Sequence, residues 1–190
     1  MAQIVNDFTL NIATANGTGS QSANLILLHS MFEMGVPVSG KNLFPSNISG
    51  LPTWFIIRAS DAGYQAPGDK THIQVVMNKD TWLADVEKAE PGTIIIHNMD
   101  VKLPVERDDC VVLGIPMTKM ARAINPKLAR MIANMYYVGG LAEVLGIDSN
   151  ALRTALTQQF KGKEKAIELN TRAIDEGRAY AAENWNCDIG

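Results

Sequence analysis

The chain has 190 residues, of which 46% are hydrophobic, and a formal net charge of -3. This length fits one domain with a sizeable core, or one with a helical appendage. The net negative charge, together with the lack of a stripe of Lys and Arg, excludes a nucleic-acid partner. No segment reaches the ~18 apolar residues of a membrane span, and no basic region precedes an apolar stretch at the amino terminus, so we expect a cytoplasmic protein without a membrane partner.

The first predicted unit is a strand, a tight turn and a helix. An apolar run over residues 8–15 predicts the strand, and apolar positions at helical spacing over 23–34 predict the helix. The first backbone N–H groups of such a helix point unpaired into the turn, where the positive end of the macrodipole also lies. The turn is therefore a predicted anion site. The residues expected to contact the anion are Gly17, Thr18, Gly19, Ser20 and Gln21.

This turn departs from the dinucleotide-binding fingerprint. Ser22 replaces the third glycine of G-x-G-x-x-G, and the acidic residue expected about 20 positions on, which would hold a ribose, is absent. A short second strand over 36–39 leads instead to Lys41, whose charge favours an anion. A generic phosphate or carboxylate site is the leading interpretation, and the alternative is a tight turn that binds nothing.

The predicted loop over 41–52 is too apolar for a solvated connection. It contains Leu43, Phe44, Ile48 and Leu51, which need cover. In an open α/β sheet this loop leaves the carboxyl end of a strand, the edge where ligands bind. We therefore expect a docking or active-site loop, with a packed Ω-loop as the alternative.

The middle of the chain alternates strands and helices. Residues 53–60 and 72–78 predict an antiparallel pair inserted into, or edging, a parallel sheet. A helical face follows over 79–89, and apolar strands follow over 93–97 and 110–115. This alternation predicts a doubly wound sheet with helices on both faces.

From about residue 126 the pattern is helical to the end. Helices are predicted over 128–145, from 148 or 149 to near 160, and over 163–185, with Gly146 capping the first. The pair Gly139-Gly140 lies inside the first of these helices and lets another backbone come close. The predicted fold is α/β, a three-layer, mostly parallel sheet flanked by helices, with a helical carboxyl-terminal section in a single domain over 1–190.

Complete catalytic machinery is not expected in this chain. No Ser lies in a G-x-S-x-G elbow, and no metal-ligand pattern is present. His29 and His72 are expected to be structural, whereas His97 and Asn98 fall at the carboxyl end of a central strand, the ligand edge. Of the two cysteines, Cys110 is expected to be a small buried hydrophobe. The prediction is therefore no catalytic residue and no metal site.

Several segments, spread over nearly the whole chain, together match one family: residues 17–21, 44–48, 115–118, 134–135, 139–141, Asn170 and Gly177. With these residues the chain resembles the gamma domain of the 2-oxoacid:ferredoxin oxidoreductases, which are thiamine-diphosphate enzymes. Many members carry Arg-Gly-Gly after a Pro-Ser segment, whereas this chain has Ser49-Gly50-Leu51. That variant resembles the alpha subunits of 2-oxoglutarate:ferredoxin oxidoreductases, in which a gamma domain precedes the thiamine-binding domain.

The resemblance implies an oxidative decarboxylation that needs other polypeptide. A 2-oxoacid, 2-oxoglutarate first among them, would become an acyl-CoA while electrons pass through iron–sulfur clusters to ferredoxin. Thiamine diphosphate, Mg and [4Fe-4S] clusters would lie on partners, a thiamine-binding alpha segment and an iron–sulfur and thiamine-binding beta subunit. The chain would then be part of an enzyme without being catalytic alone, in a dimer of heteromers.

The resemblance also implies a role near coenzyme A, because the gamma domain of this family lies over its approach to the active site. We expect coenzyme A to contact 17–21 together with Lys41, Asn42, Ser46 and Asn47. One alternative is a non-catalytic scaffold subunit that docks through Gly139-Gly140 and the apolar loop. The other is a free-standing dinucleotide-dependent dehydrogenase, and the absence of an acidic residue to bind the ribose argues against it.

Overall fold

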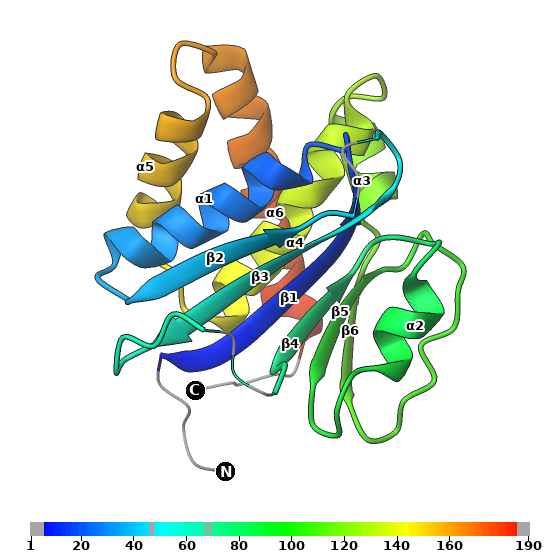
Figure 1. The fold of residues 1–190 in the computed structure, drawn as a ribbon. Helices are drawn as coiled ribbons and strands as arrows, with labels where there is room; N and C mark the ends of the chain where they lie inside the picture. The colour runs from blue at the N-terminus through cyan, green and yellow to red at the C-terminus, as the bar shows by residue number, and fades with distance from the viewer. Residues whose placement is uncertain (1–5, 46–47, 67, 69, 186–190) are drawn as a thin grey trace.

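A computed structural model describes residues 6–45, 48–66, 68 and 70–185 (Figure 1). Its strands are β1 (Asp7–Ala15), β2 (Val38–Leu43), β3 (Pro52–Ser60), β4 (Ile73–Val76), β5 (Ile94–Asn98) and β6 (Val111–Ile115). Its helices are α1 (Ser20–Glu33), α2 (Trp82–Glu87), α3 (Met117–Ile124), α4 (Ala129–Val144), α5 (Ser149–Gln159) and α6 (Glu164–Asn184). Within these described ranges, no helix combines the length and apolarity needed to cross a bilayer.

The six strands form one mixed sheet in the order β2-β3-β1-β4-β5-β6, which confirms the predicted α/β fold. Strands β1, β4, β5 and β6 are parallel, and β3 is antiparallel to both β1 and β2. The prediction that 53–60 pairs with 72–78 is wrong, because β1 lies between β3 and β4. Both faces of the sheet are covered at β1, so this apolar strand takes the central place.

Helices cover both faces of the sheet, as the apolar runs predict (Figure 1). On β4, Ile73 and Val75 pack into the large core shared with α1, α3, α4, α5 and α6, whereas Val76 packs against α2. On β5, Ile95 likewise faces α2. Because side chains alternate along a strand, each inner strand must be apolar on both sides.

The carboxyl-terminal helices α4 and α6 are in direct backbone contact. A Cβ atom added at Gly139 would lie 2.1 Å from the carbonyl oxygen of Ile174, and one at Gly177 would lie 2.5 Å from that of Tyr136. The predicted close approach at Gly139-Gly140 is therefore confirmed. Its partner is α6 of the same chain, and both glycines are buried, so their expected use as a docking surface is wrong.

Helix α3 was not anticipated from the sequence. It follows β6 directly, with Pro116 at its amino-terminal boundary. Proline suits this place because the first turn of a helix has no intrahelical acceptor for its N–H groups. Met117, Met120, Ala121 and Ile124 of α3 follow the i, i+3, i+4, i+7 spacing of a helix, so the sequence did contain a signal for it. These eight residues carry the chain from the sheet to α4.

We predict that Gly139→Ala destabilises the fold. Alanine has the higher helix propensity and would add up to about 1 kcal/mol of stability if nothing opposed it. The new methyl group meets the α6 backbone, so we expect a net loss of about 2 kcal/mol or more in the free energy of unfolding. Urea denaturation of this variant measures the loss, with Ala179→Ser at an exposed position of α6 as the control. Equal or higher stability of Gly139→Ala would contradict this packing.

Candidate functional site

The turn after β1 has the backbone conformation that its glycines predict. Gly17 and Gly19 have φ angles of 78° and 81°, which glycine adopts without strain. On one side the turn is closed by the residues before β3. The Gly50 N–H donates to the Asn16 carbonyl over 2.8 Å. A Cβ at Gly17 would come within 2.6 Å of Ser49 Oγ, so Gly17 also allows this close packing.

On its other side the turn is fastened to α4. Asn134 Nδ2 donates to the Thr18 carbonyl over 2.7 Å, and Tyr137 Oη donates to Asn24 Oδ1 on α1 over 2.7 Å. Thr14 Oγ1 donates to the buried Ser20 Oγ over 2.9 Å. The fold itself therefore fixes the shape of this turn and the start of α1.

The predicted contacts on the β2 side lie partly in a strand. β2 extends over Val38–Leu43, so the predictions of a strand over 36–39 and a loop from 41 are wrong in their bounds. Lys41 is exposed on this edge strand. Asn42 Nδ2 donates to Gln21 Oε1 over 2.8 Å, which joins β2 to the start of α1. Pairing with β3 explains the longer strand, because Lys41 and Asn42 stand opposite apolar residues of β3.

Two further predicted contacts, Ser46 and Asn47, lie outside the described residues. The apolar residues around them remain open in this chain, with Leu43 39% and Phe44 55% exposed. The loop does leave the carboxyl end of β2 beside the turn after β1, as expected. Its role in ligand binding stays a prediction.

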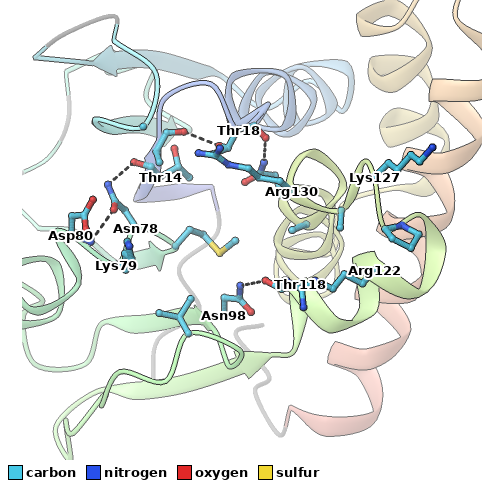
Figure 2. Close-up of a pocket in the computed structure, with 18 residues that line it drawn as sticks. Thr14, Thr18, Asn78, Lys79, Asp80, Asn98, Thr118, Arg122, Lys127 and Arg130 are labelled. Carbon is cyan, nitrogen blue, oxygen red and sulfur yellow. Dashed lines mark hydrogen bonds between the residues drawn. The ribbon is translucent and has the colours of Figure 1, made fainter.

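A cavity of about 800 Å³ lies where β1, β4 and β5 end (Figure 2). Neighbouring strands β1 and β4 are parallel, but the helices that follow them, α1 and α2, pack on opposite faces of the sheet. A crevice opens at such a switch point, and ligands of open α/β sheets bind there. Of the predicted contacts that the structure describes, Thr18 is the one that lines it.

The lining of this cavity is basic. Lys79, Arg122, Lys127 and Arg130 line it, against one acidic residue, Asp80. In the described part of the chain, no salt bridge joins any of the four cations to an acid. Arg130 reaches from α4 toward the turn after β1, whereas Lys127 points outward (Figure 2). A protein with a net charge of -3 thus gathers positive charge in this crevice.

Buried asparagines hold the strand ends that frame the cavity. Asn78 Nδ2 donates to the Thr14 carbonyl over 3.2 Å, which joins β4 to β1. Asn98 Nδ2 donates to Thr118 Oγ1 over 2.8 Å, which joins β5 to α3. Asn98 lines the cavity, as its expected place at the ligand edge requires.

His97 points the other way. Its ring stands edge-on to Trp82 of α2, with centroids 5.7 Å apart and planes at 87°. Its Nδ1 is buried and, in the described residues, has no hydrogen-bond partner, and burial lowers its pKa. Adjacent strand residues face opposite sides, so the ligand-edge expectation holds for Asn98 but is wrong for His97. His72 Nδ1 accepts the Thr9 N–H, which gives His72 the structural role expected of it.

The described residues contain no group of three or more His, Cys, Asp or Glu side chains placed to hold a metal ion. Cys110 is half-buried, with its Sγ 3.5 Å from the Glu90 carbonyl, and burial raises the pKa of its thiol. Cys187 lies outside the described ranges. The residues that the structure describes therefore offer no set of ligands that would fit an iron–sulfur cluster or the Mg of thiamine diphosphate.

Sequence reasoning missed the cations of the cavity. Lys79 comes three residues after the end of β4, a signal that could have been used, because residues after parallel strands meet at one edge. Arg122 and Arg130 carry no such signal. They reach the crevice because α3 and α4 pack over the strand ends, which is a tertiary arrangement.

A mostly parallel sheet with a basic crevice at its switch point defines an α/β domain suited to an anionic ligand. The family model described as pyruvate ferredoxin/flavodoxin oxidoreductase matches residues 9–180, and the chain belongs to this family. The resemblance inferred from the sequence is confirmed at this level.

Two curated relatives align with most of the chain. The alpha subunit of 2-oxoacid:ferredoxin oxidoreductase 2 from Aeropyrum pernix is 21% identical over 93% of this chain and 34% of its own length. Ketoisovalerate oxidoreductase subunit VorA from Methanothermobacter thermautotrophicus is 23% identical over 92% of this chain and 36% of its own. The chain thus spans about a third of the length of these relatives.

Solved structures share the fold. A 2-oxoglutarate:ferredoxin oxidoreductase from Magnetococcus marinus, solved with 2-oxoglutarate, coenzyme A and succinyl-CoA bound, superposes with a TM-score of 0.86 at 25% identity, over 96% of this chain and 32% of that one. The keto/oxoacid ferredoxin oxidoreductase gamma subunit from Geobacter sulfurreducens gives a TM-score of 0.73 at 16% identity, over 93% and 99%. The pyruvate oxidoreductase subunit PORC from Thermotoga maritima gives a TM-score of 0.71 at 22% identity, over 92% of this chain and 96% of that one.

We predict that acid destabilises the fold partly through His97. Burial holds the pKa of native His97 below its ordinary value of about 6.5, so the unfolded chain binds more protons as the pH falls through that value. The free energy of unfolding should decrease from pH 7.5 to pH 5.5, and His97→Gln should show a smaller decrease. Urea denaturation at both pH values measures this difference. The same decrease in variant and wild type would contradict a role for His97.

Proposed function

We propose that the chain is a single gamma-type domain, over 1–190, of a thiamine-diphosphate-dependent 2-oxoacid:ferredoxin oxidoreductase. In this proposal it helps bind coenzyme A during oxidative decarboxylation of a 2-oxoacid, with 2-oxoglutarate the preferred substrate. The observation that carries the proposal is the superposition over 96% of the chain on a 2-oxoglutarate enzyme that was solved with coenzyme A bound.

The proposed division of labour follows from the residues that the chain has. Thiamine diphosphate with Mg supplies the decarboxylating centre and [4Fe-4S] clusters carry the electrons, both on a thiamine-binding alpha segment and an iron–sulfur and thiamine-binding beta subunit. This chain supplies a rigid binding surface. The turn after β1 cannot relax, because Asn134 holds it on one side and Gly50 on the other. A fixed surface lowers the entropy cost of holding a long, flexible carrier.

We propose that coenzyme A contacts 17–21 together with Lys41, Asn42, Ser46 and Asn47. The Gln21–Asn42 hydrogen bond places the start of α1 beside β2. The exposed ammonium of Lys41 belongs to the neighbouring residue of the same strand. Because successive side chains of a strand point to opposite faces, Lys41 would reach the phosphate oxygens around the open edge of β2, while the amide groups of Gln21 and Asn42 lie on the α1 side.

A scaffold role is the second candidate. It is favoured by large apolar side chains that stay open around the turn after β1: Leu51 is 40% exposed and Met131 is 48% exposed, beside Leu43 and Phe44. Large apolar side chains left exposed are typical of a surface that another protein covers. The two candidates are compatible if the same partner covers this surface and supplies the thiamine site.

The assembly itself tests the proposed function. The chain, purified from its source under native conditions, should bring a thiamine-binding polypeptide and an iron–sulfur polypeptide with it in mass spectrometry. This complex should reduce ferredoxin with 2-oxoglutarate only when coenzyme A is added. Reduction with pyruvate or a branched 2-oxoacid in place of 2-oxoglutarate would overturn the substrate, and no reduction with any 2-oxoacid would overturn the function.

We predict that Lys41→Ala weakens coenzyme A binding by the complex about tenfold. Loss of one charge-assisted contact to phosphate costs about 1.5 kcal/mol, which corresponds to that factor. Isothermal titration measures the change, and Lys161→Ala, another exposed lysine, is the control. Unchanged affinity in Lys41→Ala would remove Lys41 from the site.

A further inference from the structure

The two edges of the sheet differ in character. An edge strand presents unpaired N–H and C=O groups that can pair with another chain, and proteins commonly block such an edge with a charge or a proline. At one edge, β2 carries the exposed Lys41. At the other edge, β6 has the sequence VVLGI over Val111–Ile115, without charge or proline. We infer that β6 pairs antiparallel with β6 of a second copy of this chain, which joins the two sheets. This pairing does not depend on coenzyme A binding.

The apolar side chains of β6 lie open on both faces of the sheet. Val111 is 42% exposed and Val112 is 36% exposed. Successive residues of a strand point to opposite faces, so the open edge is apolar on each side. A strand added at this edge places a cross-strand neighbour against each valine.

The backbone of β6 leaves hydrogen-bonding groups open at the same place. The Val111 N–H donates to the Thr93 carbonyl over 3.0 Å, toward β5. In a strand the next residues alternate in direction, so the backbone groups of Val112 and Gly114 point away from β5. Trp185 Nε1, at the end of α6, donates to the Gly114 carbonyl over 3.2 Å. Among the described residues, the N–H and C=O of Val112 and the N–H of Gly114 have no partner.

These open groups match one another in a single antiparallel register. With Val112 opposite Val112 of the other copy, the two residues exchange both of their hydrogen bonds. The next such pair joins Cys110 to Gly114 of the other copy. The Cys110 N–H already donates to the Arg107 carbonyl over 3.4 Å, and the Gly114 carbonyl already accepts from Trp185. The two groups that remain, the Gly114 N–H and the Cys110 carbonyl, are a donor and an acceptor that face each other.

The charges at the two ends of β6 also favour this arrangement. Asp108 is exposed just before the strand, and Lys119 is exposed in the first turn of α3, just after it. Antiparallel pairing about a two-fold axis brings each Asp108 beside the start of α3 in the other copy. Acid and cation thus meet at both ends.

The contact is small. Five residues from each copy are fewer than the roughly 20–30 residues a side of a stable interface. We therefore expect this pairing as one contact within a larger assembly that holds two copies of the chain, and the test uses that assembly as purified from its source.

A disulfide tests the register. The Cα atoms of a hydrogen-bonded antiparallel pair lie about 5.5 Å apart, within the roughly 4.4–6.8 Å that a disulfide spans. In a background of Cys110→Ser/Cys187→Ser, oxidation should link Val112→Cys into a dimer of the chain on a non-reducing gel. The matched control is Val111→Cys, which is similarly exposed. Its two copies are diagonal neighbours about 7–8 Å apart, beyond the reach of a disulfide, so it should stay monomeric on the gel.

Each result of this cross-linking decides the inference. A dimer with Val112→Cys and none with Val111→Cys supports the pairing. No dimer with either variant, or equal amounts with both, would overturn it. A link from Val112→Cys to a different polypeptide of the assembly would assign the edge to that polypeptide and overturn the second copy as its partner.

A charge at the same position gives an independent measurement. Val112→Lys places two lysines directly opposite each other, and like charges in that position are destabilising. On dilution of the assembly, followed by sedimentation, we expect the two copies to separate at an about tenfold higher concentration than in the wild type. Thr154→Lys, which adds the same charge at an exposed position of α5, should separate at the wild-type concentration. Separation of Val112→Lys at the wild-type concentration would contradict the pairing.

Discussion

The parallel pairing of β1 with β4 is the constraint on which the rest of this structure depends. From these two neighbours the chain leaves toward opposite faces of the sheet, through α1 on one side and α2 on the other. The carboxyl ends of the two strands are therefore not covered by their own connections. The crevice is a consequence of topology, and the side chains around it only decide what it can hold.

The helical section turns this crevice into a cavity with walls. α4 packs against α6 through Gly139 and Gly177, backbone against backbone, which fixes where α4 begins. From that position Asn134 reaches the carbonyl of Thr18, and Arg130 reaches toward the same turn (Figure 2). Packing far from the site thus places a hydrogen-bond donor and a cation at it. A shift of α4 against α6 would move both together.

Much of the fold could be predicted from the sequence, because periodicity reports which faces are buried. The apolar runs located β1, β5 and β6, and helical spacing located α4, α5 and α6. The order of the strands in the sheet was harder to predict. No local sequence pattern shows that β1 lies between β3 and β4, because strand order depends on contacts between residues far apart in the sequence. The extension of β2 through Lys41 was missed for the same reason, because its pairing with β3 supplies the order that its own residues do not.

The candidate site was only partly predictable. The glycines of the turn signalled a special backbone, but the same glycines also serve packing against Ser49 and Met131, and sequence alone does not separate the two uses. Of the two polar residues expected at the carboxyl end of β5, Asn98 lines the crevice, whereas His97 packs against Trp82 on the other face. Arg122 and Arg130 stayed hidden, because exposed arginines on helices look like ordinary solvated charges until tertiary packing brings them together.

The most direct measurement is a structure of the assembled complex with coenzyme A bound. The account predicts phosphate density beside the turn after β1, within hydrogen-bond reach of residues 17–21 and of the Lys41 ammonium group. Phosphates located on another polypeptide, with this turn holding only solvent, would contradict it.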